Sequence, residues 1–305
     1  KYLFYKCTTL SDVAIQGPLE IIPEYSFANC NLSALTLPGS VEDIGEYAFN
    51  SNTAMKSAIL GNNIKSIGNN AFSGCSNLTN LNLGNSLVTI GDYAFESMGS
   101  NTNTGLNVVF PNTLSTIGEY AFKESGMSSI TIPNSVTKIG KSCFINNTKL
   151  EKITIGNGCR ELPVEIFSGC SALTSVVLND GLEKISYKAF ANCKSLESIS
   201  IPGTVVQIGA TTYTGSDMRP PFDGCSALKN VRFEDGVQGL VLGALYSSDG
   251  RGLFSYCPLE EVYIGRNISY QDYSYKDNKD TFEKNPEYYG YSAFYNQPKL
   301  TKVTI

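Results

Sequence analysis

The most constraining feature of this 305-residue chain is a phenylalanine that returns, over most of the length, every 22 or 23 residues. Its positions are Phe4, Phe27, Phe49, Phe72, Phe95, Phe122, Phe144, Phe167, Phe190, Phe222, Phe254 and Phe294. The successive gaps are 23, 22, 23, 23, 27, 22, 23, 23, 32, 32 and 40 residues, so the longer ones gather late. A fixed period of this size predicts a repeat protein, in which one short structural unit is copied along the chain.

Two units written out show the frame that the repeats share. Ile67–Thr89 reads IGNNAFSGCSNLTNLNLGNSLVT, and Ile185–Gln207 reads ISYKAFANCKSLESISIPGTVVQ. The Leu-x-x-Ile-x-Leu part alternates apolar and polar residues, which predicts a short strand with one buried face. The Pro- or Gly-containing segment that follows predicts a turn. The x-x-Ala-Phe-x-x part is long enough for one helical turn, and the glycine after isoleucine suits a positive φ.

One such unit cannot fold alone. It offers roughly seven apolar side chains, each contributing about 1.5–3 kcal/mol if fully buried, whereas ordering the backbone costs about 1–2 kcal/mol per residue. Stacking closes the gap because it buries both sides of every unit and pairs its strand with those of its neighbours. We therefore predict one parallel sheet of twelve strands, centred on residues 14, 36, 59, 82, 109, 131, 154, 177, 200, 232, 263 and 304.

The frame resembles the BspA-type leucine-rich repeat over nearly all of the chain. The resemblance implies a repeat solenoid of the α/β leucine-rich type. It would be a right-handed curved array with a parallel β-sheet on the concave face and short helical turns or loops on the convex side. It also implies an exported or surface-attached protein of a microbe that lives with a host. Members of that family are associated with adhesion and are usually non-enzymatic.

The expected domain organisation is a single solenoid over residues 1–305 with about 12 repeats. Insertions are expected near residues 97–105, 210–221, 243–253 and 269–292, the first as a flexible surface loop. Solenoids need polar terminal caps for solubility, and neither end of the sequence resembles one. We therefore expect a piece of a longer array, or atypical caps.

Composition excludes several classes of function. The chain has 23 basic and 28 acidic side chains and a net charge of -5, which argues against nucleic acid as a partner. It contains no histidine, so it has no Ser-His-Asp triad, no Cys-His pair and no imidazole metal site. No apolar run is long enough for a membrane helix. We expect a secreted or cell-surface protein whose signal or anchor is not in this chain.

The nine cysteines are predicted to be reduced and buried, acting as small apolar side chains. Seven follow the repeat phenylalanine by three residues, a position that Asn52 and Asn147 take in other repeats, and two take other core positions of the frame. A disulfide between stacked neighbours such as Cys170 and Cys193 is an alternative that distance alone leaves open. A zinc site is disfavoured because paired Cys-x-x-Cys spacing is missing. The cysteines are Cys7, Cys30, Cys75, Cys143, Cys159, Cys170, Cys193, Cys225 and Cys257.

The outward strand positions predict a binding face rather than an active site. The successive pairs are Ala34/Thr36, Ser57/Ile59, Asn80/Asn82, Asn107/Val109, Ser129/Thr131, Lys152/Thr154, Ser175/Val177, Ser198/Ser200, Asn230/Arg232, Glu261/Tyr263 and Lys302/Thr304. Only Glu261 is acidic, and general acid–base chemistry needs paired carboxylates or a histidine in a cleft. No enzyme activity, cofactor or metal is therefore expected. Calcium at Asp180 or Asp235 is a weak alternative, because Asp-Gly is ordinary turn chemistry.

The late insertions are the best functional clue in the sequence. Insertions on one face of a solenoid often form its binding surface, and nine of the 18 tyrosines lie between residues 256 and 295. Tyrosine gives a large contact area at low entropic cost. The alternative is that these loops only pack over the irregular last repeats. The candidate ligand-binding residues are Asn230, Arg232, Tyr246, Glu261, Tyr263, Tyr270, Tyr273, Tyr275, Tyr288, Tyr289 and Tyr291.

These features together predict a non-enzymatic binding module that engages an extracellular or cell-surface protein, in adhesion or host interaction. It would bind through the inserted loops and the adjacent concave face. A structural spacer that projects another domain is the alternative from a different class. A glycan-binding accessory module is a further alternative, weakened because the chain lacks tryptophan.

Overall fold

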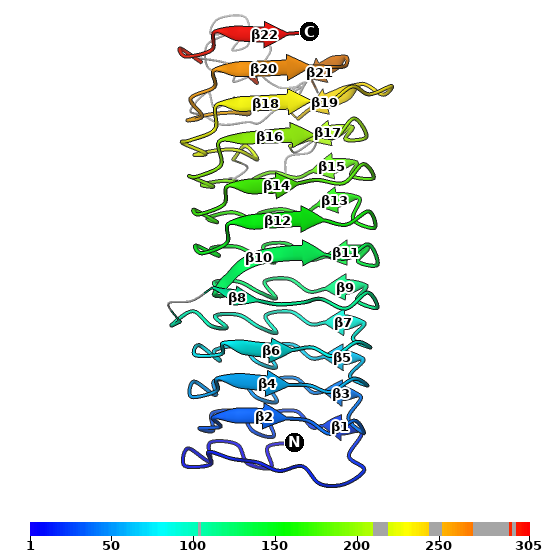
Figure 1. Ribbon diagram of the computed structural model, residues 1–305, viewed down its shortest axis with the longest axis vertical. Helices are drawn as coiled ribbons and strands as arrows, with labels where there is room; N and C mark the ends of the chain where they lie inside the picture. Colours follow the sequence, from blue (N-terminus) through cyan, green and yellow to red (C-terminus); the bar gives the residue numbers. More distant parts are fainter. Residues whose placement is uncertain (103–104, 210–218, 244–251, 271–292, 295–296) are drawn as a thin grey trace, which may run out of the picture. The chain divides into compact units, whose positions relative to one another are not determined.

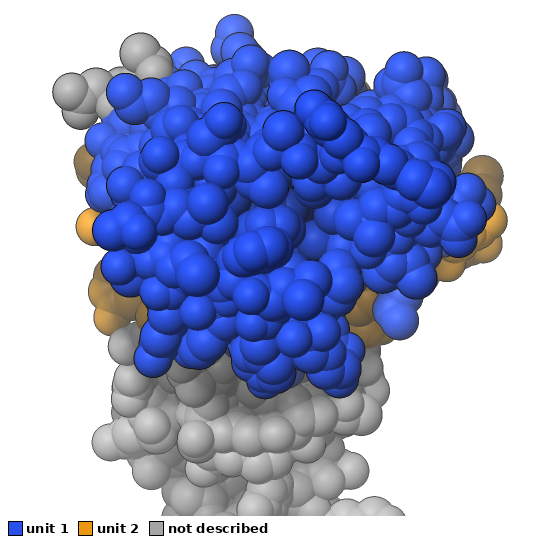
Figure 2. Space-filling model, turned by 90° about the horizontal axis from the view of Figure 1, so that it is seen from below, with its two compact units in different colours: residues 1–159 blue, residues 160–305 orange. Residues whose placement is uncertain are grey.

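A computed structural model describes residues 1–102, 105–209, 219–243, 252–270, 293–294 and 297–305. The chain divides into two compact units, residues 1–159 and 160–305, which Figure 2 colours separately. In both units short parallel strands form two columns, the odd-numbered strands in one and the even-numbered strands in the other (Figure 1). The single solenoid domain of the sequence analysis, its handedness and its curvature stay predictions.

Unit 1 holds the first twelve strands. One column is a six-stranded parallel sheet of two-residue strands: β1 (Ile21–Ile22), β3 (Asp43–Ile44), β5 (Ser66–Ile67), β7 (Thr89–Ile90), β9 (Thr116–Ile117) and β11 (Lys138–Ile139). In the other column β2, β4 and β6 form one parallel ladder, and β10 pairs with β8 and β12 in another. Their bounds are β2 (Ala34–Thr36), β4 (Ser57–Ile59), β6 (Asn80–Asn82), β8 (Leu106–Asn107), β10 (Met127–Ile132) and β12 (Lys152–Ile155).

Unit 2 repeats this arrangement. Its odd-numbered column is the parallel sheet of β13 (Glu161–Leu162), β15 (Lys184–Ile185), β17 (Gln207–Ile208), β19 (Leu240–Leu242) and β21 (Ile268–Tyr270). In the other column the parallel neighbours are β16 (Ser198–Ile201), β18 (Asn230–Phe233), β20 (Glu261–Ile264) and β22 (Lys302–Thr304), and β14 (Ser175–Val177) precedes them along the chain.

The predicted strands are confirmed at ten of the twelve positions and differ at two. β8 ends at Asn107, before the predicted centre at residue 109, and residues 7–20 contain no strand. The odd-numbered column was not predicted at all. Each of its strands is only two or three residues long. A strand that short does not show up as an alternation of apolar and polar residues. It forms because parallel pairing puts equivalent isoleucines side by side, as Ile44 and Ile67 are.

The prediction of helical turns is wrong, since the described residues contain no helix. The segment around each repeat phenylalanine folds instead as a series of tight turns. The backbone N–H of Phe49 donates to the carbonyl of Ala71 in the next repeat at 2.8 Å, whereas that of Asn50 donates back to Tyr47 at 3.2 Å. Tyr47 and Ser51 adopt φ of 54° and 57°. A helix cannot form here because alternate N–H groups bond between repeats and every fourth residue is left-handed.

The glycine after the strand isoleucine is needed for close packing, and the prediction of a positive φ is wrong at five of its six positions. Among Gly45, Gly68, Gly91, Gly118, Gly140 and Gly209, only Gly209 has a positive φ, at 85°. A Cβ on Gly68 would lie 2.7 Å from the backbone nitrogen of Glu46 in the preceding repeat. No real side chain tolerates that distance, so glycine lets the backbones of neighbouring repeats touch.

The core is a ladder of stacked phenylalanine rings. Phe49 lies between Phe27 and Phe72, with ring centroids 5.4 and 5.2 Å apart, and in unit 2 Phe190 lies 5.6 Å from both Phe167 and Phe222. The rings from Phe27 to Phe254 are buried, whereas Phe4 at the first repeat is exposed and Phe294 at the last is half-buried. The repeat phenylalanine therefore packs each repeat against the next one.

Cysteine and asparagine share a core position because each caps a phenylalanine carbonyl. The amide nitrogen of Asn52 donates to the carbonyls of Phe27 and Phe49 at 2.8 and 2.9 Å, and the thiol of Cys193 donates to the carbonyl of Phe167 at 3.3 Å. Eight cysteines are buried as predicted, and all nine are free thiols. The prediction is wrong for Cys7, which is exposed because the first repeat packs only against the one that follows.

The described part of the insertion near residues 97–105, up to residue 102, packs onto unit 1, whereas its composition predicts a flexible surface loop. Met98 is fully buried, and the backbone N–H of Asn101 donates to the carbonyl of Ser76 at 3.0 Å. The Lys149 ammonium also donates to the carbonyl of Thr102. Most of the three later insertions lies outside the described residues.

Candidate binding face

An open groove of about 400 Å³ lies on the outward face of β16, β18, β20 and β22, within unit 2. The buried strand residues Ile199, Val231 and Val262 contribute to its floor. The polar side chains above the floor form two columns set by the parallel register. One column is Ser198, Asn230, Glu261 and Lys302, and the other is Ser200, Arg232, Tyr263 and Thr304.

The centre of the groove is an arginine stacked on a tyrosine. The guanidinium carbon of Arg232 lies 3.8 Å from the centre of the Tyr263 ring, within the range of a cation–π contact. The Tyr263 hydroxyl donates to Oδ1 of Asp235 at 2.6 Å. This hydrogen bond, and then partial burial, raise the pKa of Tyr263, so the phenol remains a proton donor.

The carboxylates around the groove all have partners. Glu261 accepts a hydrogen bond from the Lys302 ammonium at 3.1 Å, and Glu234 accepts one from the Ser200 hydroxyl at 2.6 Å. Asp235 is engaged by Tyr263. Each of these three carboxylates therefore accepts a hydrogen bond from a side chain of the neighbouring repeat or turn.

Four of the predicted site residues come together in this groove: Asn230, Arg232, Glu261 and Tyr263. Tyr270 is the last residue of β21, in the other column of unit 2. The remaining six lie outside the described residues, and their role stays a prediction: Tyr246, Tyr273, Tyr275, Tyr288, Tyr289 and Tyr291.

Sequence reasoning missed Glu234 and Asp235. Both follow β18 directly and reach the groove from its turn, whereas the strand alternation identifies only residues within a strand. The one available signal was the Asp235–Gly236 pair, which was assigned to turn formation. The outward face therefore has more acidic character at its rim than its strand positions indicate.

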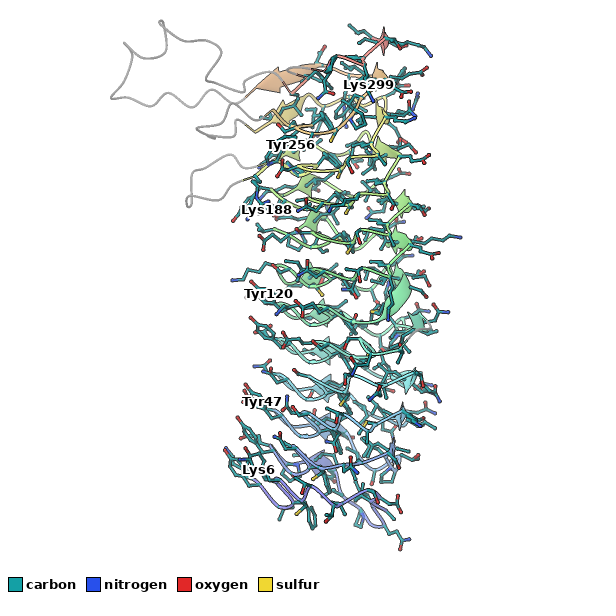
Figure 3. All side chains as sticks on the ribbon, turned by 90° about the vertical axis from the view of Figure 1, so that its left-hand side faces the viewer. Lys6, Tyr47, Tyr120, Lys188, Tyr256 and Lys299 are labelled. Carbon is teal, nitrogen blue, oxygen red and sulfur yellow. The ribbon has the colours of Figure 1, made fainter. Side chains whose placement is uncertain are left out.

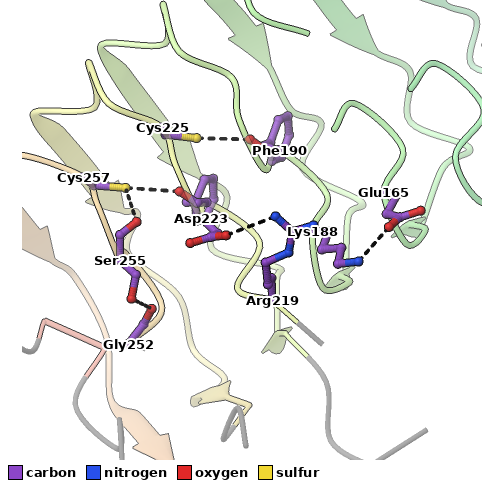
Figure 4. Close-up of polar contacts among 10 residues, drawn as sticks. Glu165, Lys188, Phe190, Arg219, Asp223, Cys225, Gly252, Ser255 and Cys257 are labelled. Atoms are coloured by element: carbon purple, nitrogen blue, oxygen red, sulfur yellow. Dashed lines mark hydrogen bonds and ion pairs between the residues drawn. The ribbon is translucent and has the colours of Figure 1, made fainter. Parts of the chain in front are cut away.

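A second group of charges in unit 2 lies on the turn side (Figure 4). The buried ammonium of Lys188 pairs with Glu165 at 2.9 Å, and Arg219 pairs with Asp223 at 3.7 Å. Beside them the thiol of Cys225 donates to the carbonyl of Phe190 at 3.1 Å. The Lys188–Glu165 and Cys225–Phe190 contacts join successive repeats, and the Arg219–Asp223 pair lies within one repeat, so we assign all three to the fold.

Unit 1 carries stacked tyrosines along its turn edge, where Figure 3 labels Tyr47 and Tyr120. Tyr25 and Tyr47 have ring centres 4.6 Å apart, and Tyr93 and Tyr120 are 4.8 Å apart, nearly parallel in both pairs. Each stacked pair covers a ring face of both partners. This edge therefore offers mainly ring edges and hydroxyl groups to a ligand.

Neither a metal cluster nor a membrane span is found in the part of the chain that the structure describes. No group of three or more Cys, Asp and Glu side chains there could hold a metal ion. No helix long and apolar enough to cross a bilayer is present among those residues.

Comparisons with known proteins agree with this architecture. The family profile of the BspA type leucine rich repeat region, in six copies, matches residues 1–106, 100–219 and 220–305. A leucine-rich repeat protein from Bacteroides ovatus is similar, with 24% identity and a TM-score of 0.59 over 88% of this chain and 79% of that one. The leucine-rich repeat protein of T. pallidum has 26% identity and a TM-score of 0.50 over 58% of this chain and 82% of its own. No curated protein matches the sequence.

Proposed function

The chain belongs to the BspA-type leucine-rich repeat family, and we propose that it is a non-enzymatic protein-binding module of a secreted or cell-surface protein. Its partner is an extracellular or cell-surface protein, in adhesion or host interaction. The binding surface is the groove on β16, β18, β20 and β22, extended by the inserted loops. The family supplies a repeat scaffold, so function has to come from the side chains that the scaffold displays.

The observation that carries the proposal is the change in the outward strand positions. On β4 and β6 these positions hold small or neutral side chains, such as Ser57 and Asn80. On β18 and β20 the same positions hold Asn230, Arg232, Glu261 and Tyr263 around a groove. Aromatic residues and arginine are the types enriched where protein interfaces bind most strongly. The fold does not require these residue types at outward positions, since their side chains do not pack in the core.

A binding screen with matched variants tests the proposal. The immobilised chain meets extracellular-matrix proteins, mucin and a glycan panel. The groove variant combines Asn230→Ala with Glu261→Ala, and the control combines Asn80→Ala with Asn82→Ala at outward positions of β6. We expect a protein partner whose binding is weakened in the groove variant and retained in the control. Replacing residues 269–292 by a short turn reports on the loops.

Two outcomes would contradict the proposal. Binding of no partner by the folded chain supports the spacer alternative, in which the repeats only project another domain. A glycan that binds in place of a protein supports the accessory-module alternative. Far-ultraviolet circular dichroism of each variant separates lost binding from lost folding.

A further inference from the structure

We propose that the groove holds a carboxylate, supplied by an acidic side chain of the protein partner, on the guanidinium of Arg232. Tyr263 and Asp235 act as positioning residues for that guanidinium. The proposal rests on the proposed function and names the chemistry that the groove recognises.

Arg232 is free to accept an anion. Its side chain is exposed on the outward face of β18, and among the described residues no carboxylate lies within ion-pair distance of it. Two other exposed cations of unit 2 are paired, Lys302 with Glu261 and Arg160 with Glu183. Stacking on Tyr263 occupies one face of the guanidinium. The in-plane N–H donors, which match a carboxylate in a bidentate way, stay available.

The guanidinium is held by a chain of contacts that starts at the backbone. Asp235 lies between two glycines where side chains would collide with it. A Cβ on Gly203 would lie 2.0 Å from the Asp235 carbonyl oxygen, and one on Gly265 would lie 2.1 Å from Oδ1. The carboxylate is therefore fixed by close packing, and it fixes the Tyr263 hydroxyl at 2.6 Å. The ring of Tyr263 then orients Arg232. Pre-orientation lowers the entropic cost of binding.

The charges around Arg232 favour a singly charged ligand. The side chains that line the groove include two cations, Arg232 and Lys302, and one carboxylate, Glu261; with the carboxylates of Glu234 and Asp235 beside it, the five charges sum to -1. Glu234 and Asp235 stand at the rim, and their repulsion grows with the charge of the ligand. A carboxylate is therefore better accommodated than a phosphate dianion. Asn230 and Ser198 add neutral hydrogen-bonding groups beside it.

The test uses a short capped peptide of alternating Glu and Gly, a Gln-for-Glu version of it, and sialyllactose as a glycan carboxylate. Binding is followed by NMR titration of the arginine Nε–H resonances, with Arg232 assigned through Arg232→Lys. We expect the Glu peptide to shift that resonance and the Gln peptide to leave it in place. The affinity should fall as salt is raised from 50 to 300 mM, conditions chosen because exposed charge pairs are screened in this range.

Variants distinguish a specific carboxylate site from non-specific binding of the peptide. Arg232→Gln should weaken the Glu peptide roughly tenfold or more, because a charge-assisted hydrogen bond is lost. Tyr263→Phe should weaken it less, and Arg160→Gln, at an exposed arginine already paired with Glu183, should have no effect. Equal binding of the Glu and Gln peptides, or unchanged binding by Arg232→Gln, overturns the proposal. Preferred binding of sialyllactose overturns the peptide as the source of the carboxylate.

The outcome is separable from that of the proposed function. A protein partner that is lost in the Asn230→Ala/Glu261→Ala variant but binds normally to Arg232→Gln would leave the binding groove in place and overturn the carboxylate site. A screen without any protein partner would count against the groove itself.

Discussion

The outward strand faces of the two units differ although the units share one repeat frame. In unit 1 small polar side chains pair with each other, as Asn80 does with Ser57 at 3.2 Å and Ser129 with Asn107 at 2.9 Å. In unit 2 the equivalent positions of β18 and β20 carry a stacked Arg232–Tyr263 pair and a groove. The interior of both units contains the same stacked phenylalanines.

The comparison shows that inward and outward positions of the repeat are under different constraints. Inward positions, the turn glycine and the capping Asn or Cys are constrained by packing against the neighbouring repeat. Outward strand positions are not, so they can change from Asn82 to Arg232 without disturbing the register. The predictions below test whether stability follows the inward positions in both units and binding follows the outward ones in unit 2.

The largest contrast is expected in thiol reactivity. Burial raises the pKa of Cys75 to about 12, so at pH 8 about one molecule in 10⁴ carries the reactive thiolate there. Cys7 in unit 1 is exposed, whereas every cysteine of unit 2 is buried. We expect an aromatic disulfide reagent to label one thiol rapidly in the native chain and nine in urea. Cys7→Ser should remove the fast phase, and rapid labelling of several thiols would contradict the burial.

The next effect is on stability and should be equal in the two units. Phe72→Ala and Phe167→Ala each remove a fully buried ring of the ladder, which should lower the free energy of unfolding by about 3–5 kcal/mol. Urea unfolding followed by circular dichroism and tyrosine fluorescence measures it, since the chain has no tryptophan. Val109→Ala, at an exposed position, is the control. A wild-type curve for either phenylalanine variant would refute the shared frame.

A smaller effect is expected at the turn glycine, for a different reason in each unit. Gly68→Ala in unit 1 would push a Cβ to 2.7 Å from a backbone nitrogen, which should cost about 1–3 kcal/mol. Gly209→Ala in unit 2 has 3.7 Å of clearance but a φ of 85°, which should cost about 1–2 kcal/mol. Gly39→Ala, with 3.9 Å to its nearest neighbour, should be nearly neutral. Thermal melts of the three variants compare the two causes.

The smallest effect on stability is expected in the groove. The Lys302–Glu261 pair is exposed on both sides, and such pairs contribute about 0–1 kcal/mol. Glu261→Gln should therefore leave the unfolding curve nearly unchanged. A loss of unfolding free energy comparable to that of Phe167→Ala would mean that the groove residues stabilise the fold. It would contradict the proposed difference between inward and outward positions.

Sequence reasoning was most successful where a residue repeats at a constant interval. Ten of the strand positions and the core position shared by Asn and Cys are confirmed, because each copy of the repeat provides another observation of the same packing. It failed where geometry depends on hydrogen bonds between repeats. The positive φ at Tyr47 and Ser51 has no counterpart in an apolar–polar pattern, so a helical turn was expected where stacked turns form.

The candidate site divides in the same way. The outward residues Asn230, Arg232, Glu261 and Tyr263 follow from the sequence by itself, because a strand places alternate residues on one face. Their assembly with Asp235 was decided only by the tertiary structure. Tyr263 and Asp235 are 28 residues apart, a separation lengthened by an insertion. Contacts between repeats depend on which backbones stack, and distance along the sequence does not determine that once the repeats differ in length.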